Sequence, residues 1–206
     1  MKTRLIIALL VMFTGLGFSQ NSFVWDKNGQ GIYESDIQEL LIDPMDDASI
    51  YAGTSKALYK SINRGKSYRM VLRLSGEAKG VNDIYISTDH PEIVYAATDA
   101  GLYESLDRGN TWERIYFSSD AGPRQCLSVI RYGDVIYLGA QKGLFYKGHQ
   151  DAQWRQIKEG LKDEPVYHIA FDDYFLYLAT GRAVFSLEKQ TRKLQKIFSF
   201  GIGKDL

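Results

Sequence analysis

The segment Val94-Tyr-Ala-Ala-Thr98, followed closely by Gly101-Leu-Tyr103, is repeated along this chain. Related copies begin at Ile50, Ile136 and Leu176, so that successive copies start 44, 42 and 40 residues apart. Each copy joins an aliphatic–tyrosine pair to small residues, and a second apolar–aromatic pair follows. A period of 20–50 residues is typical of an array of similar structural units. The repeat therefore decides the architecture of this 206-residue protein.

Four short strands are predicted in every unit, because runs of apolar residues alternate with turn residues. The two segments quoted above supply the second and third strands. First strands are predicted at Ile37–Ile42, Val81–Ile86, Leu127–Arg131 and Val166–Phe171. Fourth strands are predicted at Tyr68–Leu72, Trp112–Tyr116, Trp154–Ile157 and Leu194–Phe198. Four strands in 40–45 residues are typical of a propeller blade, so we predict an all-β propeller of four antiparallel blades.

The turn before the fourth strand of the second unit reads Ser105-Leu-Asp-Arg-Gly-Asn-Thr-Trp112. Asp107 is expected to accept backbone N–H groups inside this turn, and Gly109 to supply a positive φ. The hydroxyl groups of Ser105 and Thr111 can close the turn above the Trp112 ring. The first unit has the same pattern with conservative replacements, at Ser61, Asn63, Gly65, Ser67 and Tyr68.

These two turns resemble the Asp-box, also called the BNR repeat. That repeat occurs in sialidases, sortilin-type receptor domains, some xyloglucan-cleaving glycosidases and Ycf48-like photosystem II assembly factors. The third and fourth units keep the spacing and lack the motif. The resemblance implies a propeller whose Asp-box turns lie away from the functional face, and it implies no particular activity.

The first nineteen residues are predicted to be a signal peptide. Lys2 and Arg4 precede the apolar run Leu5–Phe13, and the small residues Gly17 and Ser19 suit a signal peptidase. Because a membrane span needs about 20 residues, this run is too short for one. We therefore predict a periplasmic or extracellular protein whose mature chain has no membrane span. Residues 20–36 are predicted to be an N-terminal strand and link, and the blades are placed at about 37–80, 81–126, 127–165 and 166–206.

Four units could just close a ring, but two features favour an open arc. Ser22–Asp26 resembles a fourth strand, yet the last unit already has its own fourth strand at Leu194–Phe198. The final residues, Gly201–Leu206, resemble a link to a further unit. We therefore predict a partial propeller, which is either a truncated reading frame or a chain whose ring is completed by further blades or a second chain.

Composition and residue spacing argue against several classes of function. Lys+Arg 25 balances Asp+Glu 25, which gives no electrostatic basis for nucleic-acid binding. The single cysteine, Cys126, excludes an intrachain disulfide framework and a Cys-rich zinc site. The three histidines, His90, His149 and His168, are isolated from one another in the repeat. We predict no cofactor and no metal.

Enzymatic activity is not expected from the residues in this chain. A sialidase would need an early Arg-Ile-Pro element, and Arg124 follows its proline instead. A xyloglucan-type glycosidase would need two carboxylates that face each other across a cleft. The candidates Asp43, Asp89 and Asp172 all follow a first strand, where an aspartate commonly caps a turn.

The predicted function is therefore an exported, non-catalytic scaffold that binds or assembles a protein or glycan partner. In propellers, ligands commonly meet the links between blades and the turns between second and third strands. The residues proposed for this face are Lys56, Asp99, Lys142 and Arg182. Since three of them are basic, both an acidic peptide or glycan surface and plain hydrophilic turns remain open. The alternative is the N-terminal part of a secreted carbohydrate-active hydrolase, sialidase-like or xyloglucanase-like, with catalytic residues beyond this chain.

Overall fold

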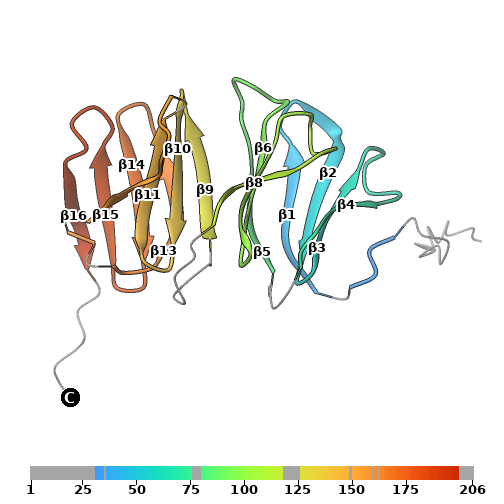
Figure 1. Ribbon diagram of the computed structural model, residues 1–206, viewed down its shortest axis with the longest axis horizontal. Coiled ribbons are helices and arrows are strands. Elements are labelled where there is room, and N and C mark those ends of the chain that lie inside the picture. The colour runs from blue at the N-terminus through green and yellow to red at the C-terminus, as the bar shows by residue number, and fades with distance from the viewer. Residues whose placement is uncertain are drawn as a thin grey trace, which may run out of the picture.

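Sixteen strands and no helix make up the part of the chain that the computed structural model describes (Figure 1). The described residues are 31–199 apart from 35, 76–79, 118–125, 149, 159 and 162. The predicted signal peptide, the predicted strand Ser22–Asp26, Arg124, His149 and the final segment Gly201–Leu206 lie outside these residues.

The strands form four antiparallel sheets, here called blades I to IV, and each blade pairs strands in their chain order. Blade I contains β1 (Ile37–Asp43), β2 (Asp46–Thr54), β3 (Ala57–Ser61) and β4 (Arg69–Arg73). Blade II contains β5 (Val81–Ile86), β6 (Val94–Thr98), β7 (Gly101–Ser105) and β8 (Glu113–Tyr116). Blade III contains β9 (Cys126–Tyr132), β10 (Val135–Ala140), β11 (Gly143–Gly148) and β12 (Arg155–Ile157). Blade IV contains β13 (Val166–Phe171), β14 (Phe175–Thr180), β15 (Ala183–Glu188) and β16 (Leu194–Ser199).

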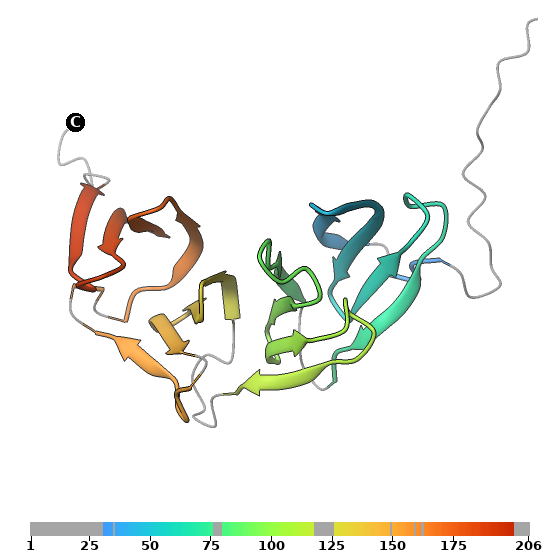
Figure 2. The same ribbon diagram turned by 90° about the horizontal axis from the view of Figure 1, so that it is seen from above.

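The blades stand side by side as an open arc, with their first strands on the inner side (Figure 2). Strand β5 packs between β1 and β9, and β9 packs on β13. This arrangement confirms the predicted all-β propeller fold with four four-stranded blades. The prediction of an open propeller agrees with the shape of the arc.

The core lies between blades. Tyr51 and Leu58 of blade I pack with Ile84 and Ile86 of blade II, and all four side chains are buried. Equivalent layers join blade II to blade III and blade III to blade IV. Each blade therefore hides its apolar faces against a neighbour, which explains why the second strands have hardly any polar positions.

Small residues allow the blades to approach closely. A Cβ atom on Gly53 would lie 2.6 Å from the Cβ of Val81 in the next blade. A Cβ atom on Gly139 would lie 2.6 Å from the carbonyl oxygen of Val166. Both distances are shorter than a van der Waals contact, so a side chain at either position would force the neighbouring blade to shift.

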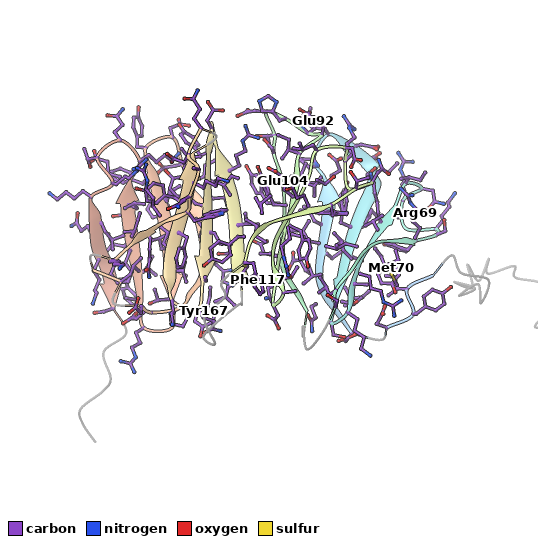
Figure 3. All side chains as sticks on the ribbon, in the orientation of Figure 1. Arg69, Met70, Glu92, Glu104, Phe117 and Tyr167 are labelled. Carbon is purple, nitrogen blue, oxygen red and sulfur yellow. The ribbon has the colours of Figure 1, made fainter. Side chains whose placement is uncertain are left out.

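The arc has two edges with different connections. Turns between first and second strands, and between third and fourth strands, lie along the upper edge of Figure 1, whereas the remaining turns and the inter-blade links lie along the lower edge. Glu92 marks the upper edge and Tyr167 marks the lower edge (Figure 3).

Candidate functional site

The Asp107 turn of blade II lies on the upper edge and is held by its own side chains. The Oδ1 atom of Asp107 accepts the backbone N–H of Asn110 at 2.9 Å and that of Thr111 at 2.8 Å. Its Oδ2 atom accepts the Thr111 hydroxyl at 2.7 Å, and the Ser105 hydroxyl donates to Oδ1 at 2.8 Å. Gly109 has a φ of 76°. Because these bonds favour the ionised carboxylate, they lower the pKa of Asp107 to about 2.

The equivalent turn of blade I uses Asn63 in the same way. The Oδ1 atom of Asn63 accepts the backbone N–H of Ser67 at 2.9 Å, and its amide donates to the Ser67 hydroxyl at 2.8 Å. Gly65 has a φ of 77°. In blade II the Trp112 ring lies beneath the turn, and its Nε1 donates to the Gly109 carbonyl at 3.2 Å. These hydrogen bonds lie within the two turns and explain why the turns contain these residues. No ligand is needed to explain them.

The four residues proposed from the sequence for the ligand face lie on separate turns of the lower edge. Lys56, Lys142 and Arg182 are exposed, and Asp99 is half-buried. The Asp99 carboxylate accepts the amide of Asn82 at 2.9 Å, which ties this turn to the first strand of its blade. None of the four lines either of the two cavities described next.

A cavity of about 550 Å³ opens on the upper edge between blades III and IV, and we call it the III–IV cleft. Its walls come from the β9–β10, β13–β14 and β15–β16 turns. Its lining residues include Tyr132, Asp134, Tyr137, Asp173, Tyr174, Glu188, Lys189, Gln190 and Arg192. Tyr174 is 71% exposed, so its side chain is accessible to a ligand at the rim of the cleft.

Two basic side chains of the III–IV cleft are held against aromatic rings. The Lys189 ammonium lies 3.1 Å from the centre of the Tyr132 ring and 5.1 Å from that of Phe171. Partial burial lowers the pKa of Lys189. The Arg192 guanidinium stacks 4.1 Å from the Tyr146 ring centre and donates to the Tyr146 hydroxyl at 2.8 Å. These contacts fix both cations in place.

A second cavity, of about 370 Å³, lies beside the first between blades II and III. It is lined by His90, Ile93, Tyr95, Glu104, Leu106, Arg131, Asp134 and Ile136. Asp134 lines both cavities, which makes them neighbours along one edge. Glu104 is labelled in Figure 3, on the side of blade II that faces blade III.

The first strands carry a polar residue at one equivalent position in each blade. Glu39, Asp83, Ser128 and His168 pair with Gly53, Ala97, Gly139 and Ala179 of their second strands, respectively. Burial raises the pKa of Asp83, and burial together with the Asp83 charge raises the pKa of Glu39. The Asp83 carboxylate accepts the backbone N–H of Val129 at 2.7 Å, so it joins blade II to blade III.

The carboxylates considered from the sequence for glycosidase chemistry cap turns in two of the three cases. Asp43 accepts the backbone N–H of Met45 at 2.9 Å. Asp172 accepts those of Tyr174 and Phe175 at 2.8 and 2.7 Å, and these bonds lower its pKa. Within the described ranges no group of three His, Cys, Asp or Glu side chains could hold a metal ion. The described part of the chain also has no helix that could cross a membrane.

Comparison with known proteins identifies the class of fold. An ancestral GH74 enzyme matches with a TM-score of 0.69 and 18% identity, over 82% of this chain and 26% of that chain. The extracellular domain of a putative one-component system from B. thetaiotaomicron matches with a TM-score of 0.66 and 16% identity, over 84% and 23%. Ycf48 bound to D1 peptide matches with a TM-score of 0.56 and 9% identity, over 81% and 60%.

This protein therefore has the β-propeller fold, and it spans about a quarter of the first two chains and three fifths of the third. No protein-family model matches the sequence, and no curated protein matches it. At identities of 18% and below, these likenesses establish the fold and leave the activity to be proposed.

The sequence did not single out the III–IV cleft. Its residues come from three turns that differ between blades, so the repeat gave no reason to align them. One signal was present: Tyr174 and Arg192 stand in turns where small polar residues are usual, and Tyr132 ends the strand before such a turn. The residues that line the cleft are unevenly spaced in the sequence, and they come close together only when blades III and IV pack.

Proposed function

We propose that this chain is a non-catalytic, exported propeller domain that binds a glycan in the III–IV cleft. The observation that carries this proposal is the cavity of about 550 Å³ between the two blades, with the exposed Tyr174 side chain at its rim. Ligand sites are generally concave and combine apolar rings with a few polar groups that fix orientation. The cleft lies on the upper edge, opposite the turns that carry Lys56, Asp99, Lys142 and Arg182.

The chemistry of the cleft suits a neutral polyhydroxyl ligand. A tyrosine ring offers a flat apolar face to the C–H groups of a sugar, while its hydroxyl stays hydrated. Carboxylate, amide and guanidinium groups can each bind adjacent hydroxyl groups through paired hydrogen bonds. Three acidic side chains, Asp134, Asp173 and Glu188, nearly balance Lys189 and Arg192. Because the charges nearly cancel, the cleft is better matched to a neutral sugar than to a strongly charged ligand.

The export signal predicted from the sequence fits this proposal. The Asp-box resemblance supports the propeller fold but does not favour this edge, because the Asp107 turn and the cleft both lie on the upper edge. The two turns around Asn63 and Asp107 have the sequence and hydrogen bonds expected of Asp-boxes. The structural likenesses include GH74 enzymes and the extracellular domain of a putative one-component system. A periplasmic or extracellular glycan-binding domain is compatible with each of these observations.

The test is calorimetric titration with a panel of neutral oligosaccharides, including xyloglucan fragments. We expect one or more to bind, and we expect Tyr174→Ala to weaken that binding at least about tenfold. Tyr33→Ala is the matched control, because Tyr33 is 63% exposed and lies outside the cleft. Failure of the whole panel to bind, or equal losses in both variants, would contradict the proposal.

The second candidate is part of a carbohydrate-active hydrolase, which the GH74 likeness favours. Such an enzyme would release reducing ends from xyloglucan, and a single carboxylate-to-amide change would abolish the release. Asp134→Asn is the first variant to assay, since Asp134 lines both cavities. If the wild type hydrolyses xyloglucan and Asp134→Asn does not, the hydrolase reading would replace the non-catalytic proposal.

A further inference from the structure

Two blade faces in the open arc have no neighbouring blade among the described residues. The leading face is the side of blade I that points away from blade II, with Leu40 and Ile42 on β1. The trailing face is the side of blade IV that points away from blade III, with Ala170 on β13 and Tyr177 on β14. Figure 2 shows blades I and IV at opposite ends of the arc.

The leading face carries residues of the kind that are buried inside the arc. Leu40 pairs with Ala52 as Ile84 pairs with Ala96, so Leu40 and Ile84 occupy equivalent positions. Ile84 is 4% exposed against blade I, whereas Leu40 is 57% exposed. The next pair behaves alike, because Ile86 is 4% exposed and Ile42 is 54% exposed. Blade I thus carries the apolar residues of a junction, and the described residues supply no blade to cover them.

The trailing face of blade IV carries the equivalents of the residues with which each earlier blade contacts the blade that follows it. Tyr51, Tyr95 and Tyr137 are buried where each blade meets the next one. Tyr177 is their equivalent in blade IV, and it is only half-buried. Its hydroxyl donates to Asp172 of its own blade, whereas Tyr51 reaches across the junction to the carbonyl of Arg108 at 2.8 Å.

We propose that two copies of this chain close into one ring, in which the leading face of each copy packs on the trailing face of the other. A chain that carries both halves of one kind of junction is complementary to itself, and a head-to-tail contact that closes produces a finite assembly. At the internal junction Tyr51 meets Arg108. The matching residues of the proposed junction are Tyr177 and Arg64, and Arg64 has the same φ of 58° as Arg108.

The position of the proposed contact is further limited by residues 31–34. Ile32 packs on Ala52, Ala57 and Tyr59, and the Tyr59 hydroxyl donates to Glu34. These residues cover the outer part of the leading face and leave Leu40 and Ile42 exposed. The second copy is therefore expected to contact the inner strand β1 and the upper-edge turn of blade I.

The experiment measures the mass of the full chain by light scattering coupled to size-exclusion chromatography. We expect twice the single-chain mass of 23.4 kDa, or twice the mass left after signal cleavage. Leu40→Glu and Ala170→Glu place a charge on the leading and the trailing face, respectively, and each is expected to weaken dimerisation at least about tenfold. Both positions are exposed in the single chain, so both variants should keep the wild-type circular dichroism spectrum.

Leu106→Glu is the matched control, because Leu106 is 64% exposed on a turn of blade II that belongs to neither face. It should leave the two-chain mass unchanged. A single-chain mass for the wild type over a wide concentration range would overturn the proposal. Loss of the dimer in only one of the two face variants would also overturn it, because that result indicates a symmetric contact through one blade. A mass above two chains would overturn it as well, because it indicates an open filament.

Discussion

The junctions inside the arc and the two faces at its ends are built from equivalent residues, yet they differ in burial. Ile84 and Ile86 are almost fully buried, and their equivalents Leu40 and Ile42 are more than half exposed. The backbone pairing is the same in both places. The difference shows that backbone hydrogen bonds form each four-stranded sheet without help from a neighbour. The burial of apolar side chains, in contrast, depends on packing against the next blade.

The largest expected effect compares Ile84→Ala with Leu40→Ala. Truncating a buried isoleucine removes apolar contact and leaves a cavity, so Ile84→Ala should lower the free energy of unfolding by about 2–4 kcal/mol. Leu40→Ala should change it by less than about 0.5 kcal/mol when both are measured at concentrations too low for the proposed dimer to form. Urea denaturation followed by circular dichroism measures both. Similar losses in the two variants would show that the leading face is covered in the single chain.

The second comparison adds a methyl group instead of removing several. A Cβ atom on Gly139 would lie 2.6 Å from the Val166 carbonyl oxygen, whereas one on Gly181 would lie 3.7 Å from the Tyr167 ring. Gly139→Ala should therefore cost about 1–3 kcal/mol, because the blades must separate. Gly181→Ala should be nearly neutral in the same urea titration. A neutral Gly139→Ala would mean that the junction between blades III and IV is loosely packed.

The third comparison removes one hydroxyl group at a junction and one at an end face. Tyr51→Phe deletes the bond to the Arg108 carbonyl, and we expect a loss of about 0.5–1.5 kcal/mol. Tyr177→Phe deletes an exposed bond to Asp172, and its thermal midpoint should stay at the wild-type value. Thermal unfolding of both variants checks the difference. A larger loss for Tyr177→Phe would reverse the ranking of the two regions.

The smallest effect concerns the Asp107 turn of an interior blade and the Asn63 turn of an end blade. The folded pKa of Asp107 is about 2, below its ordinary value of 3.8, so its contribution is present above pH 3.8 and is lost as the pH falls through about 2. Asp107→Asn places in blade II the residue that blade I has at Asn63. It should remove the loss of stability that protonation of Asp107 causes at low pH. Asp107→Ala should lower the thermal midpoint at pH 7 by a few degrees, while Asp107→Asn keeps it closer to the wild type. Equal acid sensitivity in the wild type and Asp107→Asn would contradict this account.

The fold was predictable because its main signal is local and repeated. All sixteen strands predicted for the four units are present, with shifts at the ends: β2 begins at Asp46 rather than Ile50, and the fourth strand of blade II begins at Glu113 rather than Trp112. The second shift has a physical reason, since the Trp112 indole bonds back to Gly109 and belongs to the turn. Pairing between consecutive strands needs no long-range information.

The candidate site was much less predictable. The lower-edge residues Lys56, Asp99, Lys142 and Arg182 were chosen from the places where propellers commonly bind ligands, and their role stays a prediction. The III–IV cleft depends on how two blades lean together, which the periodic pattern does not contain. Glu39 and Asp83 were missed for a related reason: their shifted pKa values come from burial between blades. The III–IV cleft and the shifted pKa values of Glu39 and Asp83 both depend on contacts between blades, which the sequence of a single repeat does not contain.

The pairing order of the strands has a consequence for how the molecule forms. Among the described residues, hydrogen-bonded strands are always neighbours in the chain, so each sheet can assemble from hairpins of short sequence separation. A finished blade then offers a template on which the next one condenses, in the manner of nearest-neighbour repeat arrays. Assembly can thus advance along the polypeptide one blade at a time, and the slow step is expected to be the docking of blades rather than the making of any sheet.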